Sequence, residues 1–392
     1  MVYSLQWYST GIVNFGIYHE KHFLGRLIIA QRGYIVNVRD DSVRIDRVGK
    51  SQIEIAAIGM GCWAYGGGVY WGGQAQPVVN EIISYALEHG VNYFDTAEVY
   101  NDGESERSLG IALKGRREKA VIGTKVSTSN IMPATLRKHC EKSLLRLDAD
   151  YIDIYMLHWP VNKTSIAHFA ADSELLDNLP DVAEVFGTLL NLKKEGKIRE
   201  IGISNHGVGQ MKEILAVGTD IAVNELPYNL ISRAIEAEIL PFCIKNHIGV
   251  IGYMAYQQGI LTGAYKSFEQ LSPSQAHSRH FIMERGREMS RHNEKGAEGE
   301  ILKLLSVING VSNQLGVSFA TVSLAWAMAK EGISCTLVGS RNIDELKMNI
   351  AAAEYVLPKD ALDALNAASK PVLNKLGDNP DYYENRNTSR VW

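Results

Sequence analysis

The sequence predicts an α/β protein built on a (β/α)8 TIM barrel, with an N-terminal β-hairpin and long loops at the C-terminal face of the barrel. Two observations predict this fold. From Val43 onward, short apolar segments alternate with longer segments whose apolar residues recur at spacings of three and four. The short segments show no strict alternation with polar residues, which is typical of parallel strands buried on both faces. Eight such units within about 300 residues match one barrel.

The predicted elements follow one another in a regular order. Residues 43–63 contain a Gly-Lys-Ser turn between two short strand-like runs, which predicts a hairpin. Helical periodicity is clearest at 78–89, 134–147 and 185–196, and the last of these ends in Gly196, a common helix stop. The expected barrel strands are 56–61, 93–96, 120–125, 152–158, 198–204, 222–226, 249–254 and 335–340.

An open, doubly wound sheet is the alternative architecture. It would place the pattern GxGxxG after the first strand, with an acidic residue about 20 positions later. Residues 59–68 read GMGCWAYGGG, so the third glycine of that pattern is missing. The barrel is therefore favoured over the dinucleotide-binding open sheet.

Two segments exceed what a minimal barrel needs. Residues 260–299 are polar and rich in histidine and arginine, and residues 376–392 form a tail. Long segments without a clear period are usually functional lids or disordered. Both segments are candidates for shaping a pocket.

Composition excludes several classes of protein. The chain has 392 residues, 46% of them hydrophobic and 21% charged, and a net charge of −4, which is not the strongly basic character of a nucleic-acid binder. No uninterrupted apolar run approaches the roughly 20 residues that span a bilayer. The cysteines at 62, 140, 243 and 335 have no metal-binding spacing and indicate reduced thiols. We therefore expect a cytoplasmic protein with no metal, no membrane partner and no nucleic-acid partner.

Residues 1–42 precede the predicted barrel and divide the chain into two regions. This stretch is apolar and aromatic but interrupted by charges such as Glu20, Lys21 and Arg26, and it lacks the order of regions found in a signal peptide. We interpret it as an extension that is poorly ordered or packed on the outside, or as the result of a start codon placed too far upstream. Residues 43–392 form the barrel with its C-terminal tail.

Polar residues stand at the ends of three consecutive predicted strands. Asp95 and Tyr100 follow one strand in the run VNYFDTAEVY, Lys125 closes the next, and His158 closes the third. Each has an ordinary structural explanation when taken singly, such as a helix cap or a solvated charge. The C-terminal ends of the strands carry the active site of such barrels. Taken together, the four residues therefore indicate a catalytic site.

The residue types explain one another chemically. A tyrosine is a poor acid near neutrality because its unperturbed pKa is about 10. A nearby cation lowers that pKa, and Lys125 would supply the charge, with Asp95 as the carboxylate that keeps a buried lysine protonated. Tyr100 is then a tuned general acid and base, and His158 a donor to the substrate oxygen. Because this set supplies no electrons, a hydride-carrying cofactor is implied.

With these residues in place, the sequence resembles the aldo-keto reductase family over residues 43–370. The resemblance rests on FDTAEVY, GTK, LHWP, GKIREIGISNH, LPYNLISR, GILTG and VGSRNIDELKMNI, in this order. It implies a (β/α)8 barrel and NADPH- or NADH-dependent reduction of a carbonyl group. It also implies that the family's catalytic tetrad is Asp95, Tyr100, Lys125 and His158.

The resemblance further implies a site for the nicotinamide cofactor. The carboxamide end would be held by Ser204 and Asn205, with the ring stacked on Tyr253. The pyrophosphate would pass Gly259 and Leu261. The adenosine end would lie at Ser340, Arg341, Glu345 and Asn349.

Two positions depart from the family pattern. Glu225 stands where the family usually has glutamine, and a carboxylate only accepts hydrogen bonds whereas an amide also donates them. Glu345 stands where many members carry arginine or glutamine, and it would repel a 2′-phosphate that Arg341 would attract. The expected cofactor is NADP, with NAD as the alternative.

Aromatic residues near the predicted loops provide candidate walls for a substrate pocket. These are Trp63, Tyr65, Trp71 and Trp159, and the tail adds Tyr382 and Tyr383. They suit a small aldehyde, ketone or sugar as the substrate. Two other functions remain open: a cofactor-binding regulatory subunit with incidental turnover, and a sugar-binding module. The intact set of four catalytic residues favours the enzyme.

Overall fold

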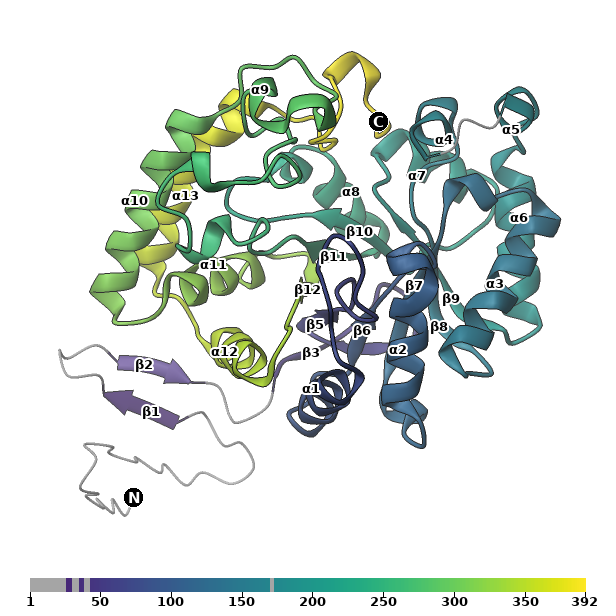
Figure 1. The fold of residues 1–392 in the computed structure, drawn as a ribbon, viewed down its shortest axis with the longest axis horizontal. Helices are drawn as coiled ribbons and strands as arrows, with labels where there is room; N and C mark the ends of the chain where they lie inside the picture. Colours follow the sequence, from purple (N-terminus) through teal and green to yellow (C-terminus); the bar gives the residue numbers. More distant parts are fainter. Residues whose placement is uncertain (1–25, 30–34, 39–42, 170–172) are drawn as a thin grey trace.

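The computed structural model describes residues 26–29, 35–38, 43–169 and 173–392, and eight parallel strands of this part close into a barrel (Figure 1). The strand order is β10-β11-β12-β5-β6-β7-β8-β9, and pairing of β9 with β10 closes the ring. The closed ring confirms the predicted TIM barrel and excludes the open sheet. The strands are β5 (Ile58–Gly61), β6 (Tyr93–Asp95), β7 (Val121–Val126), β8 (Ile152–Leu157), β9 (Ile198–Ser204), β10 (Val223–Pro227), β11 (Gly249–Tyr253) and β12 (Ile333–Val338).

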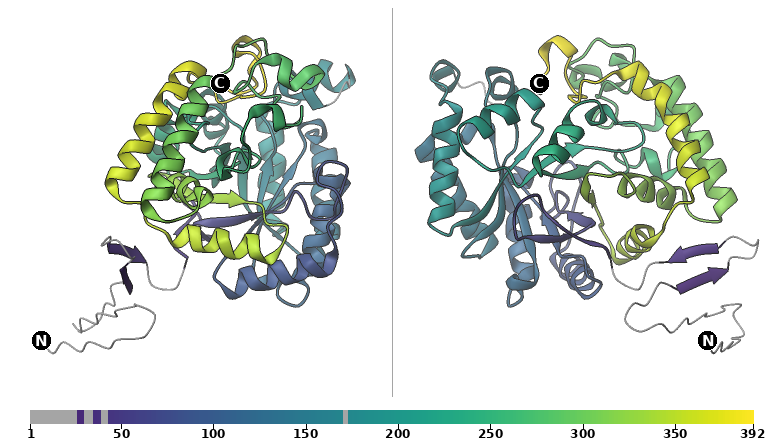
Figure 2. Two further views of the ribbon diagram at one scale, coloured as in Figure 1. Left: turned by 60° about the vertical axis from the view of Figure 1, so that its left-hand side comes forward. Right: turned by 180° about the vertical axis from the view of Figure 1, so that it is seen from behind.

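Helices form the layer around this barrel (Figures 1 and 2). They are α1 (Gln76–Glu88), α2 (Glu104–Leu113), α3 (Pro133–Leu147), α4 (Lys163–Phe169), α5 (Ser173–Asp177), α6 (Val182–Lys194), α7 (Val208–Ala216), α8 (Ile239–Asn246), α9 (Met283–Gly286), α10 (Glu298–Leu315), α11 (Phe319–Met328), α12 (Ile343–Glu354) and α13 (Lys359–Leu376). Helices α1, α3 and α6 confirm the three helices predicted from periodicity. Of the helices in the described residues, none combines the length and the apolar character needed to cross a membrane.

The N-terminal hairpin predicted at 43–63 is present. Strand β3 (Ile45–Arg47) pairs antiparallel with β4 (Glu54–Ala56), and Gly49 in the turn has a φ of 54°, a value that favours glycine. Val48, Ile53 and Ile55 pack with the side chains that fill the barrel interior. The turn at Gly49 lies against the backbone of Ala222 and His247, just before β10 and β11, so the hairpin covers the N-terminal end of the barrel.

A second hairpin lies within the N-terminal extension. Strand β1 (Arg26–Ile29) pairs antiparallel with β2 (Ile35–Val38). The other residues of the extension, 1–25, 30–34 and 39–42, lie outside the described part of the chain. The division at residue 42 and its interpretation remain predictions.

The barrel interior is built in layers, with apolar side chains below and polar side chains above. Alternate residues of a strand point to the same face. Three buried apolar residues of the interior are therefore each followed, two positions later, by an inward-facing polar residue. The pairs are Tyr93 and Asp95, Met156 and His158, and Val223 and Glu225.

Close packing in the apolar layer brings β6 and β7 together beneath the polar layer. Gly123 lies opposite Asp95 in the β6–β7 register, and a Cβ on Gly123 would lie 2.2 Å from the Tyr93 hydroxyl oxygen. Any larger residue at 123 would collide with the Tyr93 ring. Lys125 follows Gly123 by two positions on the same face, so its side chain enters the polar layer next to Asp95.

The two long segments pack against each other over the C-terminal end of the barrel. Arg279, in segment 260–299, is fully buried and pairs with Glu294 at 2.8 Å. Its guanidinium also donates to the carbonyl oxygens of Leu376, Asn379 and Asp381, at 2.8, 3.2 and 3.1 Å. A single arginine therefore ties the segment to the start of the tail.

Replacing Arg279 by methionine is expected to lower the free energy of unfolding by about 3 kcal/mol, because it leaves a carboxylate and three carbonyl oxygens without their buried donor. Urea denaturation measures the change. The matched control is Lys359→Met, whose side chain is 87% exposed and pairs with Asp363 one helical turn away. That change should cost less than about 0.5 kcal/mol. Equal losses in the two variants would contradict the proposed role of Arg279.

Candidate active site

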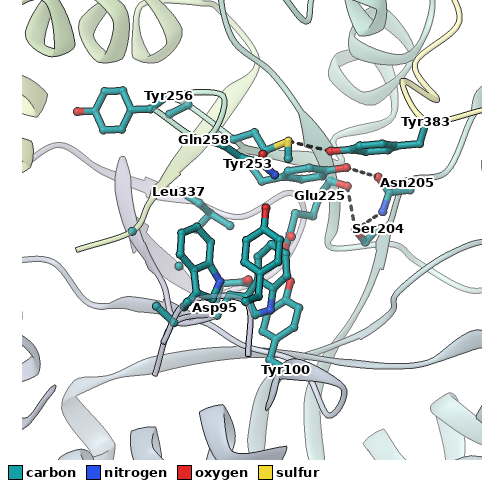
Figure 3. A pocket seen from close by; sticks show the side chains of 18 of the residues that line it. Asp95, Tyr100, Ser204, Asn205, Glu225, Tyr253, Tyr256, Gln258, Leu337 and Tyr383 are labelled. Atoms are coloured by element: carbon teal, nitrogen blue, oxygen red, sulfur yellow. Dashed lines mark hydrogen bonds between the residues drawn. The ribbon is translucent and has the colours of Figure 1, made fainter. Parts of the chain in front are cut away.

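A cavity of about 870 Å³ opens at the C-terminal end of the barrel (Figure 3). Its lining comes from the strand ends, the loop after β5, segment 260–299 and the tail. The cavity therefore brings together residues that lie far apart in the sequence. The predicted site residues that line it are Trp63, Trp71, Asp95, Tyr100, His158, Trp159, Ser204, Asn205, Glu225, Tyr253, Gly259, Arg341 and Glu345.

Five predicted site residues lie outside this lining. Lys125 is buried directly behind it, as described below. Asn349 donates to the Ser340 hydroxyl at 3.0 Å and accepts from Tyr256 at 2.7 Å, and Tyr256 itself lines the cavity. Leu261 is fully buried in the apolar core.

The expectation that Tyr65 forms a pocket wall needs correction. Tyr65 is 0% exposed and belongs to the apolar core. The loop after β5 turns this ring inward, while Trp63 and Trp71 of the same loop face the cavity. The sequence shows four aromatic residues near loops but does not show which way each ring turns.

Lys125 is fully buried between two carboxyl groups. Its Nζ lies 2.6 and 2.7 Å from the two Asp95 oxygens and 3.4 Å from Glu225 Oε1. It also donates to the Thr96 carbonyl oxygen at 3.0 Å. Burial alone would lower the pKa of Lys125, but the two neighbouring carboxyl groups, Asp95 more than Glu225, raise it above its usual value. The side chain is therefore an ammonium group at neutral pH.

The Tyr100 hydroxyl lies 3.5 Å from this ammonium group. The sequence predicts that Lys125 lowers the pKa of Tyr100, and this is correct for the contribution of that charge but wrong for the net shift. Burial raises the pKa of Tyr100 above its ordinary value, and the Lys125 charge offsets only part of that effect. The sequence shows the nearby cation but not the loss of water around the phenol.

His158 faces Tyr100 edge-on, with ring centroids 5.8 Å apart and planes inclined by 76°. Its backbone N–H donates to the Val126 carbonyl oxygen at 3.0 Å, which fixes the residue at the end of β8. Burial, and to a smaller extent the charge of Lys125, lowers the pKa of His158 to about 3. The imidazole is thus neutral at physiological pH, and it can donate through only one ring nitrogen.

Aromatic rings form one wall of the cavity next to Tyr100. Trp63 stacks on Tyr100 with centroids 5.6 Å apart and on Tyr70 at 4.9 Å. Asn101 holds this wall in place, because its amide donates to the backbone oxygens of Trp63 and Tyr65 at 2.8 and 2.9 Å. Asn101 has a φ of 50°, a left-handed value that asparagine adopts more readily than most residues.

A hydrogen-bonded chain of side chains covers the opposite part of the cavity (Figure 3). The Tyr253 hydroxyl donates to Asn205 Oδ1 at 2.7 Å, and the Asn205 amide donates to the Ser204 hydroxyl at 3.0 Å. The same amide donates to the His158 carbonyl oxygen at 3.1 Å. Asn205 also has a left-handed φ, 61°. These contacts fix the Tyr253 ring relative to the strand ends.

Arg341 and Glu345 line the far end of the cavity, next to the N-terminus of α12. Glu345 accepts from the backbone N–H of Arg341 at 2.8 Å and from the Asn342 side chain at 2.9 Å. The Arg341 guanidinium donates to Gln74 Oε1 at 3.3 Å and to the Gly73 carbonyl oxygen at 3.1 Å. Both side chains are therefore within reach of one ligand group.

Segment 260–299 and the tail also supply lining residues, and the sequence points to only one of them, Tyr383. They are His277, Glu288, Met289, Arg291, Tyr383 and Arg390. Arg390 contacts both oxygens of Asp381 at 2.7 Å and stacks over Trp159 at 3.6 Å. The segments lack periodicity, so their length was the one available signal that they shape a pocket.

Comparisons with known proteins identify similar sequences and structures. The sequence model of the Aldo/keto reductase family matches residues 57–370. The NADH-specific methylglyoxal reductase of Escherichia coli is 29% identical over 345 residues, which cover 81% of this chain and 98% of that protein. Aldo-keto reductase YhdN of Bacillus subtilis is 30% identical over 309 residues, covering 75% and 84% of the two chains. An aldo-keto reductase of Klebsiella pneumoniae, solved in complex with NADPH, has a TM-score of 0.63 and 26% identity, covering 84% and 96%.

The His158 ring is expected to stay neutral when the protein is titrated from pH 8 to about pH 5, since burial costs the charged form more than it costs the neutral form. Nuclear magnetic resonance of the imidazole, assigned by loss of its signal in His158→Gln, measures the titration. A midpoint near the ordinary value of about 6.5 would contradict the burial described here.

Proposed function

The chain belongs to the aldo/keto reductase family, and on this premise we propose that it reduces small aldehydes or ketones at the cavity floor formed by Asp95, Tyr100, Lys125 and His158. It is an NAD(P)-dependent oxidoreductase. The observation that carries the proposal is the Tyr100 hydroxyl, which lines the cavity 3.5 Å from the buried Lys125 ammonium and faces the His158 ring.

The cavity residues fit a nicotinamide dinucleotide in their chemistry. The amide of Asn205, the Ser204 hydroxyl and the Glu225 carboxyl gather on one side of the Tyr253 ring, and the buried Glu225 Oε2 has no hydrogen-bond partner in the described part of the chain. We propose that these groups hold the carboxamide end and that Tyr253 stacks on the nicotinamide ring. Gly259 would border the pyrophosphate, and Leu261, which is buried in the apolar core, would only anchor that loop. Ser340, Arg341, Glu345 and Asn349 would hold the adenosine end.

When bound, the nicotinamide cofactor supplies a hydride to the carbonyl carbon of the substrate. His158, as a neutral imidazole, donates a hydrogen bond to the carbonyl oxygen and orients it beside Tyr100. Tyr100 then transfers its proton to that oxygen. The raised pKa of Tyr100 keeps the proton on the phenol until negative charge develops on the oxygen. Lys125 stabilises the resulting phenolate, and Asp95 keeps Lys125 protonated.

The substrate class follows from the wall beside Tyr100. Trp63, Trp71 and Trp159 line this part of the cavity and provide apolar faces for a small carbonyl compound or a sugar. Two similar Escherichia coli proteins are named methylglyoxal reductases. Methylglyoxal is therefore the first aldehyde to assay, followed by other aldehydes, ketones and open-chain sugars, each with NADPH and with NADH. A complete panel without cofactor oxidation would contradict the proposed function.

Tyr100→Phe is expected to lower kcat by ~10²–10⁴-fold, because it removes the proton donor and leaves the ring in place. The affinity for the cofactor, measured by the quenching of tryptophan fluorescence, should be unchanged. The matched control is Tyr70→Phe, which removes a phenol from the same aromatic wall, remote from Lys125. A variant at position 100 that keeps the wild-type rate at saturating substrate would exclude Tyr100 as the proton donor.

Cofactor preference is expected to depend on Arg341 and Glu345, and we propose NADP as the cofactor with NAD as the alternative. Arg341→Gln should shift the ratio of kcat/KM values toward NADH, since the guanidinium would pair with the 2′-phosphate. Glu345→Gln should shift it toward NADPH, because it removes a like charge while its amide oxygen still accepts the hydrogen bond from the backbone N–H of Arg341. Each shift of tenfold corresponds to ~1.4 kcal/mol. If neither ratio moves, the adenosine end lies elsewhere.

A further inference from the structure

Two buried carboxyl groups share one buried ammonium group at the cavity floor. Asp95 and Glu225 are each 3% exposed, and Lys125 is 0% exposed. Both carboxyl groups have an oxygen within 3.4 Å of Lys125 Nζ. If both acids were ionised, the cluster would carry a net negative charge away from water. Such a charge is costly in a protein interior, and a buried group usually neutralises instead. One of the two carboxyl groups is therefore expected to hold a proton.

The contacts show which carboxyl group holds it. Both oxygens of Asp95 contact Lys125 Nζ, at 2.6 and 2.7 Å, as expected for an ionised partner. Glu225 reaches Lys125 with one oxygen only, at 3.4 Å, and its buried Oε2 has no hydrogen-bond partner among the described residues. An ionised carboxylate with an unsatisfied buried oxygen is far more costly than a neutral acid. The geometry therefore favours Glu225 over Asp95 as the group that holds the proton.

The other groups around Glu225 do not supply a second positive charge. Among the described residues, the titratable groups that face Glu225 besides Asp95 and Lys125 are Tyr93 on β6, Tyr100 after β6, Tyr253 on β11 and Cys335 on β12. Burial raises the pKa of each of these four groups, so they are neutral at neutral pH. Burial and then repulsion by Asp95 raise the pKa of Glu225 well above its usual value, although Lys125 opposes both.

We propose that Glu225 is a neutral carboxylic acid in the working protein and acts as a positioning residue, keeping the Asp95–Lys125 pair at balanced charge beneath the Tyr100 hydroxyl. As an acid it also recovers the donor that a carboxylate lacks, so it can donate as well as accept hydrogen bonds. Loss of this proton at alkaline pH would add a negative charge near Tyr100 and disfavour the phenolate. The kinetic part of this inference rests on the proposed function, whereas the bound proton does not.

The bound proton makes stability depend on pH in a defined direction. In the unfolded chain Glu225 ionises near pH 4.3, so above about pH 5.5 the folded state binds one proton more than the unfolded state. Stability from this group is complete below the unfolded pKa and is lost as pH rises toward the folded pKa. The folding equilibrium constant of the wild type should therefore fall about tenfold per pH unit relative to a variant without the group.

The test compares urea denaturation of the full-length wild type and Glu225→Gln at pH 5.5, 6.5, 7.5 and 8.5. The glutamine keeps the size of the side chain and cannot ionise. The control is Asp153→Asn, because Asp153 is also fully buried but contacts two guanidinium groups, those of Arg117 and Arg199, each at 2.6 Å. The quantity compared is the folding equilibrium constant of the wild type divided by that of the variant. The proposal is supported if this ratio falls about tenfold per pH unit for Glu225→Gln and stays constant for Asp153→Asn. Constant ratios for both variants overturn it.

Two further measurements cover other outcomes. If Glu225→Gln does not fold, infrared spectroscopy of the wild type at pH 7 tests the proposal instead. A neutral buried carboxylic acid has a carbonyl stretching band that shifts in deuterium oxide. If no such band is present, the proposal is overturned. If the protein proves active, the alkaline fall in kcat should move to higher pH in Glu225→Gln. If no substrate is turned over, the proposed function fails while the denaturation result still decides the protonation of Glu225.

Discussion

The ion pair between Lys125 and Asp95 is the interaction on which the site depends. An ammonium group with no exposed surface is stable only beside a carboxylate, and the two Asp95 oxygens provide it at 2.6 and 2.7 Å. The pair fixes the positive charge beneath the Tyr100 hydroxyl and sets the electrostatic environment of His158. Removing either partner would leave a single charge buried at the end of the barrel, so stability and chemistry are coupled at this point.

The barrel produces this pair by register rather than by any special loop. In the apolar layer the Tyr93 ring occupies the space that a side chain at Gly123 would need. Two residues later on each strand, Asp95 and Lys125 meet in the polar layer. The same two-residue step carries β10 from Val223 to Glu225. A closed ring of parallel strands therefore directs polar groups from several strands to one small volume, where burial strengthens every charge interaction.

The loops outside the ring determine what the cavity admits. Asn101 fixes Trp63 against Tyr100, and Arg279 fastens segment 260–299 to the tail, which brings Tyr383 and Arg390 to the cavity wall. These contacts use backbone oxygens as acceptors, so they fix the course of the chain as well as single side chains. The polar floor of the cavity thus comes from strand ends, while its aromatic wall comes from segments that carry no clear strand or helix period.

Sequence by itself determined the fold and most of the floor of the site. The alternation of buried strands with amphipathic helices is a local pattern, and Asp95, Tyr100, Lys125 and His158 stand at strand ends that local patterns locate. Tertiary structure decided what depends on contacts between distant residues. It turned Tyr65 into the core, raised the pKa of Tyr100 where the sequence argument expected a fall, and joined the tail to segment 260–299. It also placed Glu225 within 3.4 Å of a lysine 100 positions earlier in the chain, because burial and through-space distance are not encoded in spacing along a strand.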